Sequence, residues 1–263
     1  MKPTRILCIA VVVVAVVAPL PAQTLETSPD ARPDTQSSAA ASAPEPGAAR
    51  GFLVDVAHDY TNFVSWQNGL WLGAGGLASL AAHQGDEAAF ESVAAGNAPE
   101  LPGGSAWGSS AVQLPLAVGW WVVGNAAHSE RASAAGRDLV RAQISVTSWT
   151  YAIKLIAQRT RPNGEPHSFP SGHASNSFAA ATVLAEHYGW KLGVPAYAMA
   201  AYTAASRVTA NQHWVSDVVF GAALGVVSGR TVTLRLRQNR VSFLPVKLPG
   251  GGAVLLTVRK TEE

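Results

Sequence analysis

The sequence has little cysteine and little charge. Cys8 is the one cysteine among 263 residues, and 14% of the residues are charged, against roughly 25% in an ordinary soluble domain. A single cysteine excludes an internal disulfide and a zinc site built on two or more thiolates. Apart from Lys2 and Arg5, basic and acidic residues are equal in number. A polyanion-binding surface, and with it a nucleic-acid partner, is therefore not indicated.

The first residues have the features of an export signal. Two basic residues precede an apolar stretch over residues 6–20, and Ala22 offers a small residue for cleavage. Leu20 stands where a small residue is preferred, which leaves an uncleaved N-terminal anchor as the alternative. We therefore expect a signal peptide over residues 1–22 and an exported protein.

Composition predicts three further segments. Residues 23–50 are mainly Pro, Ser, Ala and acidic residues, and they have too few apolar side chains to offset the entropy of ordering, so we expect a disordered linker. Residues 51–230 contain long apolar runs broken by short polar clusters, which favours a helical domain. In residues 231–263 apolar and polar residues alternate around a glycine turn, which predicts a β-rich tail with a hairpin or three short strands.

Two runs without charge, Tyr60–Gly85 and Leu101–Ser129, dominate the first half of the helical domain. Each is longer than the ~20 apolar residues that cross a bilayer. Four shorter helices rich in Ala, Gly and Ser are expected over residues 137–158, 173–188, 192–206 and 214–229. Such small residues suit close helix packing in membranes, and they also suit a soluble bundle. We expect an all-α bundle of about six helices embedded in a membrane, with a soluble bundle as the alternative.

Three short clusters at helix ends carry the candidate chemistry. In the first, Lys154 and Arg161 lie about two turns apart on one helix face, and Pro162 then ends the helix. Taken alone, this pair fits a positively charged helix end that anchors at a membrane surface. Arg159 fits that explanation better than a catalytic one.

The second and third clusters combine an anion site with a possible nucleophile. The turn Phe169–His173 precedes an apolar helix, so its backbone N–H groups and the helix dipole favour an anion, with His173 at the edge. In the third cluster Arg207 is followed by His213 and Asp217. Spacing of i and i+4 lets the carboxylate accept a hydrogen bond from one ring nitrogen and leaves the other as nucleophile or base.

Together the clusters resemble the three-part signature of the type 2 phosphatidic acid phosphatase and vanadium haloperoxidase superfamily. The resemblance covers residues 154–217 and leaves the linker and the tail outside. No signature position is substituted in Lys154-x6-Arg161-Pro162, Pro170-Ser171-Gly172-His173 and Ser206-Arg207-x5-His213-x3-Asp217. The resemblance implies that Lys154, Arg161 and Arg207 bind the phosphoryl oxygens. Ser171 and the backbone N–H of Gly172 would complete this cradle.

The resemblance also implies a role for the remaining three residues. His213 would attack phosphorus and form a phosphohistidine, while Asp217 would hold the imidazole in its reactive tautomer. His173 would protonate the leaving oxygen and later accept a proton from the hydrolytic water. We expect no metal and no other cofactor, because three cations take the place of a metal ion and the sequence offers no compact carboxylate cluster for Mg²⁺.

These expectations define a function with open alternatives. The leading hypothesis is a phosphatase of lipid phosphomonoesters or pyrophosphates in the inner membrane, with its active site facing the periplasm. The alternatives are a soluble periplasmic acid phosphatase of broad specificity, a vanadate-dependent haloperoxidase, and a non-catalytic membrane scaffold. His167 borders the predicted site without an assigned role. The other histidines are expected to be surface or interfacial residues: His58, His83, His128 and His187.

Overall fold

The computed structural model describes residues 46–234, 241–248 and 251–258. The predicted signal peptide and most of the predicted linker lie outside the described residues. Residues 46–50, which the sequence assigned to the linker, already belong to the first helix.

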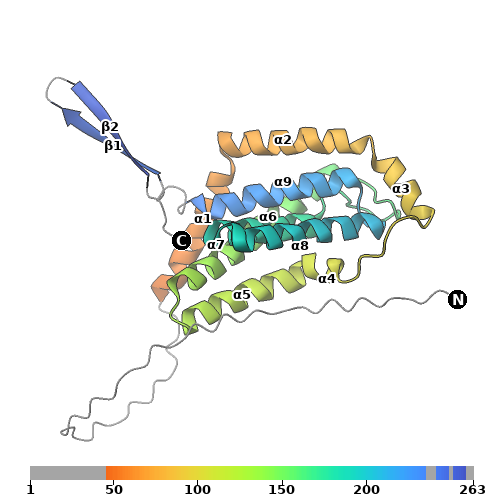
Figure 1. The fold of residues 1–263 in the computed structure, drawn as a ribbon, viewed down its shortest axis with the longest axis horizontal. Helices are drawn as coiled ribbons and strands as arrows, with labels where there is room; N and C mark the ends of the chain where they lie inside the picture. The colour runs from red at the N-terminus through yellow and green to blue at the C-terminus, as the bar shows by residue number, and fades with distance from the viewer. Residues whose placement is uncertain (1–45, 235–240, 249–250, 259–263) are drawn as a thin grey trace, which may run out of the picture. The chain divides into compact units, whose positions relative to one another are not determined.

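The described residues before the tail form nine helices (Figure 1), so the prediction of a helical bundle is confirmed. Their bounds are α1 Pro46–Phe63, α2 Trp66–His83, α3 Asp86–Ala94, α4 Gly104–Gly108, α5 Ser110–Ala126, α6 Glu130–Ala157, α7 Gly172–Tyr188, α8 Trp190–Thr209 and α9 Val215–Val232. The number exceeds the predicted six because both long uncharged runs are broken and because α3 forms between them.

The break in the first run lies between α1 and α2. Ser65 has an extended backbone, and its hydroxyl accepts a hydrogen bond from Asn68 N at 3.4 Å, which starts a new helix. The side-chain amide of Asn68 donates back to the carbonyl of Phe63 at 3.2 Å, so it satisfies the end of α1. One asparagine thus serves both helix ends.

The second run breaks around the short helix α4. Gly103 adopts a left-handed conformation with φ of +79° before α4, and Ser109 is extended between α4 and α5. A Cβ atom on Gly108 would lie 2.4 Å from Cγ2 of Thr203 and 3.0 Å from Cβ of His173. Only glycine lets α4 pack so closely against α7 and α8.

The core lies where α6, α7 and α9 meet, with α2 packed along α9 and α5 along α6 (Figure 1). Most of its buried apolar side chains come from these three helices, among them Leu139, Val146, Val183, Leu224 and Val227, and Phe63 of α1 joins them.

The crossing of α7 and α9 is unusually close. A Cβ atom on Gly225 would lie 2.3 Å from the carbonyl oxygen of Ser175, and one on Gly221 would lie 2.7 Å from that of Ser171. Because both helices start near this crossing, their N-termini lie side by side. The close approach therefore brings the second and third signature clusters together.

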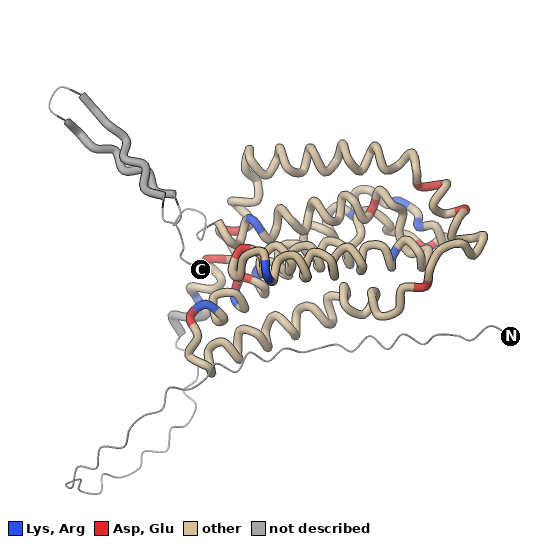
Figure 2. The backbone as a smooth tube through the Cα atoms, viewed as in Figure 1, with Lys and Arg blue, Asp and Glu red and all other residues tan. Residues whose placement is uncertain are grey.

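The surfaces of α2 and α5 are apolar. Neither helix contains an Asp, Glu, Lys or Arg (Figure 2). Large apolar side chains on both are exposed to solvent: Leu70, Trp71, Leu77, Leu80, Leu116, Val118, Val122 and Val123. Among the described residues one helix, α9, is long and apolar enough to cross a membrane, and 61% of it is buried inside the bundle.

The tail departs in part from the predicted β-rich segment over 231–263. β1 (Val241–Leu248) pairs antiparallel with β2 (Gly251–Val258). The strand expected from residue 231 is wrong at its start, because α9 continues to Val232. The hydroxyl of Thr231 donates to the carbonyl of Val227 at 2.8 Å and accepts from the Asn68 amide at 2.9 Å, so helical packing overrides the alternating pattern.

Candidate active site

The predicted site residues converge at one end of the bundle, where α6 and α8 end and α7 and α9 begin. They border a cavity of about 240 Å³. Six of the eight predicted residues lie on or directly behind its wall: Lys154, Arg161, Gly172, His173 and His213 line it, and Asp217 stands behind His213. Hydroxyl and amide groups line the rest of the cavity: Ser109, Ser110, Thr147, Thr150, Tyr151 and Asn176.

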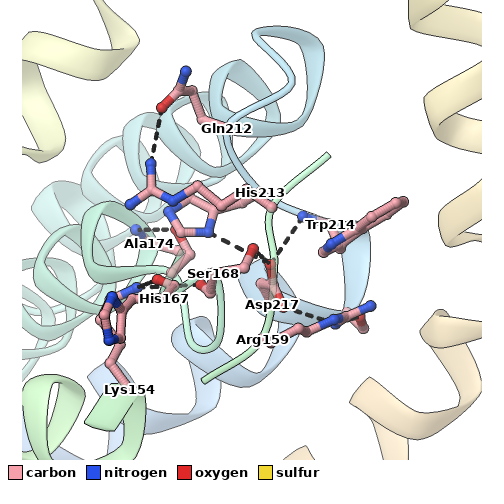
Figure 3. A network of polar contacts seen from close by, with 12 residues as sticks. Lys154, Arg159, His167, Ser168, Ala174, Gln212, His213, Trp214 and Asp217 are labelled. Atoms are coloured by element: carbon pink, nitrogen blue, oxygen red, sulfur yellow. Dashed lines mark hydrogen bonds and ion pairs between the residues drawn. The ribbon is translucent and has the colours of Figure 1, made fainter. Parts of the chain in front are cut away.

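The two lining cations are each held by a loop beside the cavity: Lys154 by the loop that connects α6 to α7, and Arg161 by the loop that connects α8 to α9. The ammonium group of Lys154 donates to the backbone carbonyls of His167 and Ser168, the latter at 3.2 Å. The guanidinium of Arg161 donates to the side-chain oxygen of Gln212 at 2.9 Å (Figure 3). His167, whose role the sequence left open, therefore orients Lys154 through its backbone.

Two arginines near the site each have a buried N–H donor without a hydrogen-bond partner in the described part of the chain. Among the described residues, Nε of Arg161 and Nε of Arg207 are buried and have no hydrogen-bond partner. A buried donor without a partner costs free energy, on the order of 1–3 kcal/mol. An anion with several acceptor oxygens would satisfy both.

Ser171 and Arg207 differ from the other predicted cradle residues. Ser171 is fully buried, and its hydroxyl accepts from the Ala174 N–H at 3.4 Å, so it caps α7. Neither residue lines the cavity itself. The side of α7 that faces the cavity is formed by Gly172 and His173.

His213 and Asp217 form a buried pair. Nδ1 of His213 faces Oδ2 of Asp217 at 3.5 Å, and the two side chains are 2% and 0% exposed. Because Nδ1 faces the carboxylate, Nε2 is the nitrogen left for a ligand in the cavity. Burial lowers the pKa of His213; Asp217 opposes this, while Lys154 and Arg161 reinforce it, and the net pKa is below the ordinary value. His213 is therefore neutral at neutral pH.

Asp217 is fixed by three further donors. Its Oδ2 accepts from the hydroxyl of Ser168 and from the backbone N–H of Trp214 at 2.9 Å, and its Oδ1 accepts from Nη1 of Arg159 at 2.8 Å (Figure 3). The expectation that Arg159 is a surface cation is wrong. It fails because the turn after α6 directs this side chain back against the start of α9.

Sequence reasoning also missed the role of two other residues. His83, expected at a surface, is exposed but contacts Asp86 at 2.8 Å, and Asp86 pairs with Arg159 at 2.8 Å. His187, also expected at a surface, is buried, and its Nε2 lies 3.0 Å from Asp138. His83 and Asp86 are three residues apart. The Asp86–Arg159 and Asp138–His187 pairs are 73 and 49 residues apart, so no local spacing signals these two contacts.

The described part of the chain contains no group of three or more His, Cys, Asp or Glu side chains placed to hold a metal ion. The charged groups around the cavity are instead the cations described above. Their arrangement suits an anionic ligand with several oxygens.

Comparison with known proteins gives a family match and partial relatives. Residues 138–241 match the family model described as PAP2 superfamily. The chain is 42% identical over 82 residues to lipid A 1-phosphatase of Porphyromonas gingivalis, covering 30% of this chain and 18% of that protein. It is 37% identical over 76 residues to lipid A 4'-phosphatase of Helicobacter pylori, covering 29% of this chain and 38% of that protein. The chain thus spans less than half the length of either relative.

Among solved structures, the chain is similar to a transmembrane PAP2 type phosphatidylglycerolphosphate phosphatase from Bacillus subtilis. The two are 21% identical with a TM-score of 0.43, and the match covers 73% of this chain and 95% of that one.

Proposed function

We propose, from the match of residues 138–241 to the PAP2 superfamily model, that the chain is a phosphatase of lipid phosphomonoesters or pyrophosphates that needs no metal ion. One observation carries the proposal: two cations, a helix N-terminus and two histidines face a single cavity. The names of both curated relatives, lipid A phosphatases, support a lipid substrate.

The phosphoryl group binds between α6 and α7. Lys154 and Arg161 contribute positive charge, and Gly172 presents the N-terminus of α7, whose backbone N–H groups and dipole favour an anion. Arg207 adds its unsatisfied Nε from behind the cavity wall. These groups stabilise the charge on the transferring phosphoryl group.

His213 is the nucleophile. Nε2 attacks phosphorus in line, the bond from phosphorus to the leaving oxygen breaks, and a phosphohistidine forms. The imidazole gains positive charge in this step, and the buried Asp217 carboxylate stabilises it. Water then attacks phosphorus, and His213 leaves as neutral imidazole.

His173 moves the protons. It stands on the second residue of α7, and it borders the same cavity as His213. It donates a proton to the leaving oxygen in the first step and accepts one from the attacking water in the second. The cycle returns it to its starting protonation state.

The surroundings of the cavity suit a substrate with an apolar tail. Tyr151 lines the cavity, and the next exposed apolar side chains on α6 are Leu155 and Ile156, which are 65% and 84% exposed. With the apolar surfaces of α2 and α5, they favour a position in a membrane. The predicted signal peptide supports an active site on the periplasmic side.

A second candidate is a water-soluble periplasmic acid phosphatase. One observation favours it: the single described helix that is apolar enough to span a membrane is mostly buried inside the bundle. A soluble protein would use the same cavity for small phosphate esters.

Phosphate release by the purified full chain tests the proposal. The panel holds lipid A, phosphatidic acid, a polyprenyl pyrophosphate, and small soluble phosphate esters, each assayed with EDTA present. Turnover of at least one lipid in preference to the soluble esters supports the proposal. Turnover of soluble esters alone supports the second candidate, and no release from any substrate contradicts both.

A further inference from the structure

Arg159 and Asp86, which lie behind the His213–Asp217 pair, are not part of the signature; together they are called the charged clamp below. Resting on the proposed function, we propose that Arg159, itself fixed by Asp86, is a positioning residue that aligns Asp217 for the nucleophile His213. The inference follows from how Asp217 and Asp86 share one guanidinium group.

The guanidinium of Arg159 bridges two buried carboxylates. Nη1 donates to Oδ1 of Asp217 and Nη2 donates to Oδ2 of Asp86, both at 2.8 Å. The two aspartates are 0% and 4% exposed, whereas Arg159 is 26% exposed. The guanidinium also lies over the indole ring of Trp214, 5.3 Å from its centre. Because two carboxylates and one aromatic ring contact the guanidinium, the Arg159 side chain is restricted to one position.

Asp86 is anchored by the residue next to Asp217. Its Oδ1 accepts from the backbone N–H of Ser216 at 2.9 Å, and its Oδ2 accepts from the Ser216 hydroxyl at 2.6 Å. Burial raises the pKa of Asp86, but the hydrogen bonds from Ser216, Arg159 and His83 outweigh this effect and hold its pKa below the ordinary value. Asp86 is therefore an anion that can orient Arg159.

The clamp decides which oxygen of Asp217 faces His213. Arg159 occupies Oδ1, so the carboxylate cannot turn without breaking a charge-assisted bond, and Oδ2 stays directed at Nδ1 of the imidazole. Ser168 and the Trp214 N–H hold the same Oδ2 from the other side. Arg159 thus acts on the nucleophile through Asp217 and does not line the cavity.

The experiment compares Arg159→Gln, Arg159→Lys and Asp86→Asn with the wild-type full chain, using p-nitrophenyl phosphate as probe. We expect kcat to fall for Arg159→Gln on the order of 10–100-fold, the usual loss when an orienting partner is removed. KM should stay nearly constant, because Lys154 and Arg161 are unchanged. Lysine keeps the charge but cannot bridge both carboxylates, so Arg159→Lys should recover part of kcat.

The pH profile separates positioning from a purely structural role. Without Arg159 the charge of Asp217 is no longer shared, so it favours the protonated, non-nucleophilic form of His213. The acidic limb of kcat/KM should then move to higher pH in Arg159→Gln and less so in Asp86→Asn. A structural defect alone would lower the amount of active enzyme without moving the limb.

Arg131→Gln is the matched control, because Arg131 is also a partly buried arginine that makes a tertiary hydrogen bond: it donates to the backbone carbonyl of His187 at 2.7 Å, at the start of α6, away from the cavity. It should keep wild-type kcat and pH profile. Wild-type kcat in all three test variants, or a rise in KM with unchanged kcat, overturns the proposal. If Arg159→Gln fails to fold, Asp86→Asn and Arg159→Lys decide by the same criteria. A wild-type chain inactive on every phosphoester contradicts the proposed function instead.

Discussion

Nδ1 of His213 faces Oδ2 of Asp217 at 3.5 Å, and both groups are shut off from solvent. His173 borders the same cavity, but the charges that act most strongly on its ring come from Arg207, His213, Arg161 and Lys154. The two histidines therefore differ in their electrostatic surroundings. This difference supports the proposal that His213 is the nucleophile and His173 transfers protons.

The two histidines should respond differently to the leaving group. His213→Ala removes the covalent route and should leave no activity on any substrate, whereas His173→Ala removes only proton transfer, an effect of roughly 10²–10⁴ in rate. With p-nitrophenyl phosphate, whose leaving group departs with little protonation, His173→Ala should recover part of its activity. Rates are measured for an alkyl and a nitrophenyl phosphate. Wild-type rates in His213→Ala would show that this mechanism is wrong.

The pH dependence follows from His213. Attack requires the neutral imidazole, and its pKa lies below the ordinary value of 6.5. The acidic limb of kcat/KM should therefore lie below pH 6.5, with activity kept as the pH falls through that value. The same shift predicts the sign for folding: protonation favours the unfolded chain, so the free energy of unfolding should decrease as the pH falls below 6.5. A limb above 6.5 in the wild-type chain would contradict the burial of this ring.

Chelation should leave the rate unchanged. Lys154 and Arg161 stabilise the phosphoryl charge, so activity should survive excess EDTA, measured as phosphate release before and after dialysis against the chelator. Vanadate should inhibit competitively, because its five-coordinate form mimics the transition state in the same cradle. Loss of turnover with EDTA, restored by a divalent ion, would rule out a mechanism based on these cations.

The crossing of α7 and α9 predicts opposite effects at two glycines. Gly225→Ala places a Cβ atom against the Ser175 carbonyl, so it should lower the free energy of unfolding by about 1–3 kcal/mol and disturb the site. Gly119→Ala, on an open face of α5 with no atom within 4 Å of the added Cβ, should raise it by roughly 0.5–1 kcal/mol. Thermal denaturation of both variants under identical conditions measures the difference. Equal effects would mean that the helices do not cross this closely.

Location can be tested in two steps. An alkaline phosphatase fusion joined after Ala43, before α1 begins, should be active if the N-terminus directs export. The full chain should then stay with membranes in carbonate at high pH, because the apolar surfaces of α2 and α5 require an apolar environment. An inactive but well-expressed fusion contradicts export, and complete release into the supernatant favours the soluble candidate.

The signature was sufficient to predict the centre of the site but not its support. Lys154, His173 and His213 lie at or next to helix ends, which local patterns predict best. Arg161 also lines the cavity, but the prediction that it shares a helix face with Lys154 is wrong, because α6 ends at Ala157 and Arg161 lies in the loop that follows. Arg159 and Asp86 meet across a long stretch of chain, through the folding of α3 against α9. Such a contact depends on tertiary packing and has no periodic signal in the sequence.

The helical class was predictable for the same reason, and the helix boundaries were not. Continuous absence of charge over Tyr60–Gly85 suggested one span, but Asn68 interrupts it by bonding to the end of α1. At the other end, β-branched residues near Thr231 suggested a strand, yet buried hydroxyl groups bonded to helical carbonyls keep them in α9. In both places a side-chain hydrogen bond outweighed the pattern of hydropathy.

Asp86 lies before the segment that matches the family model. Under the role proposed for Arg159 and Asp86, an unbroken signature therefore does not guarantee a working enzyme. A homologue that keeps every signature residue and has Asn in place of Asp86 would match any search for the signature. Under the proposal, its Asp217 would still be poorly aligned for His213. Likewise, grafting residues 138–241 onto a foreign N-terminal half would transfer the phosphate cradle without its anchor. Homologues that keep the signature but lack an acidic residue at the position of Asp86, the first residue of α3, are accordingly expected to have low activity.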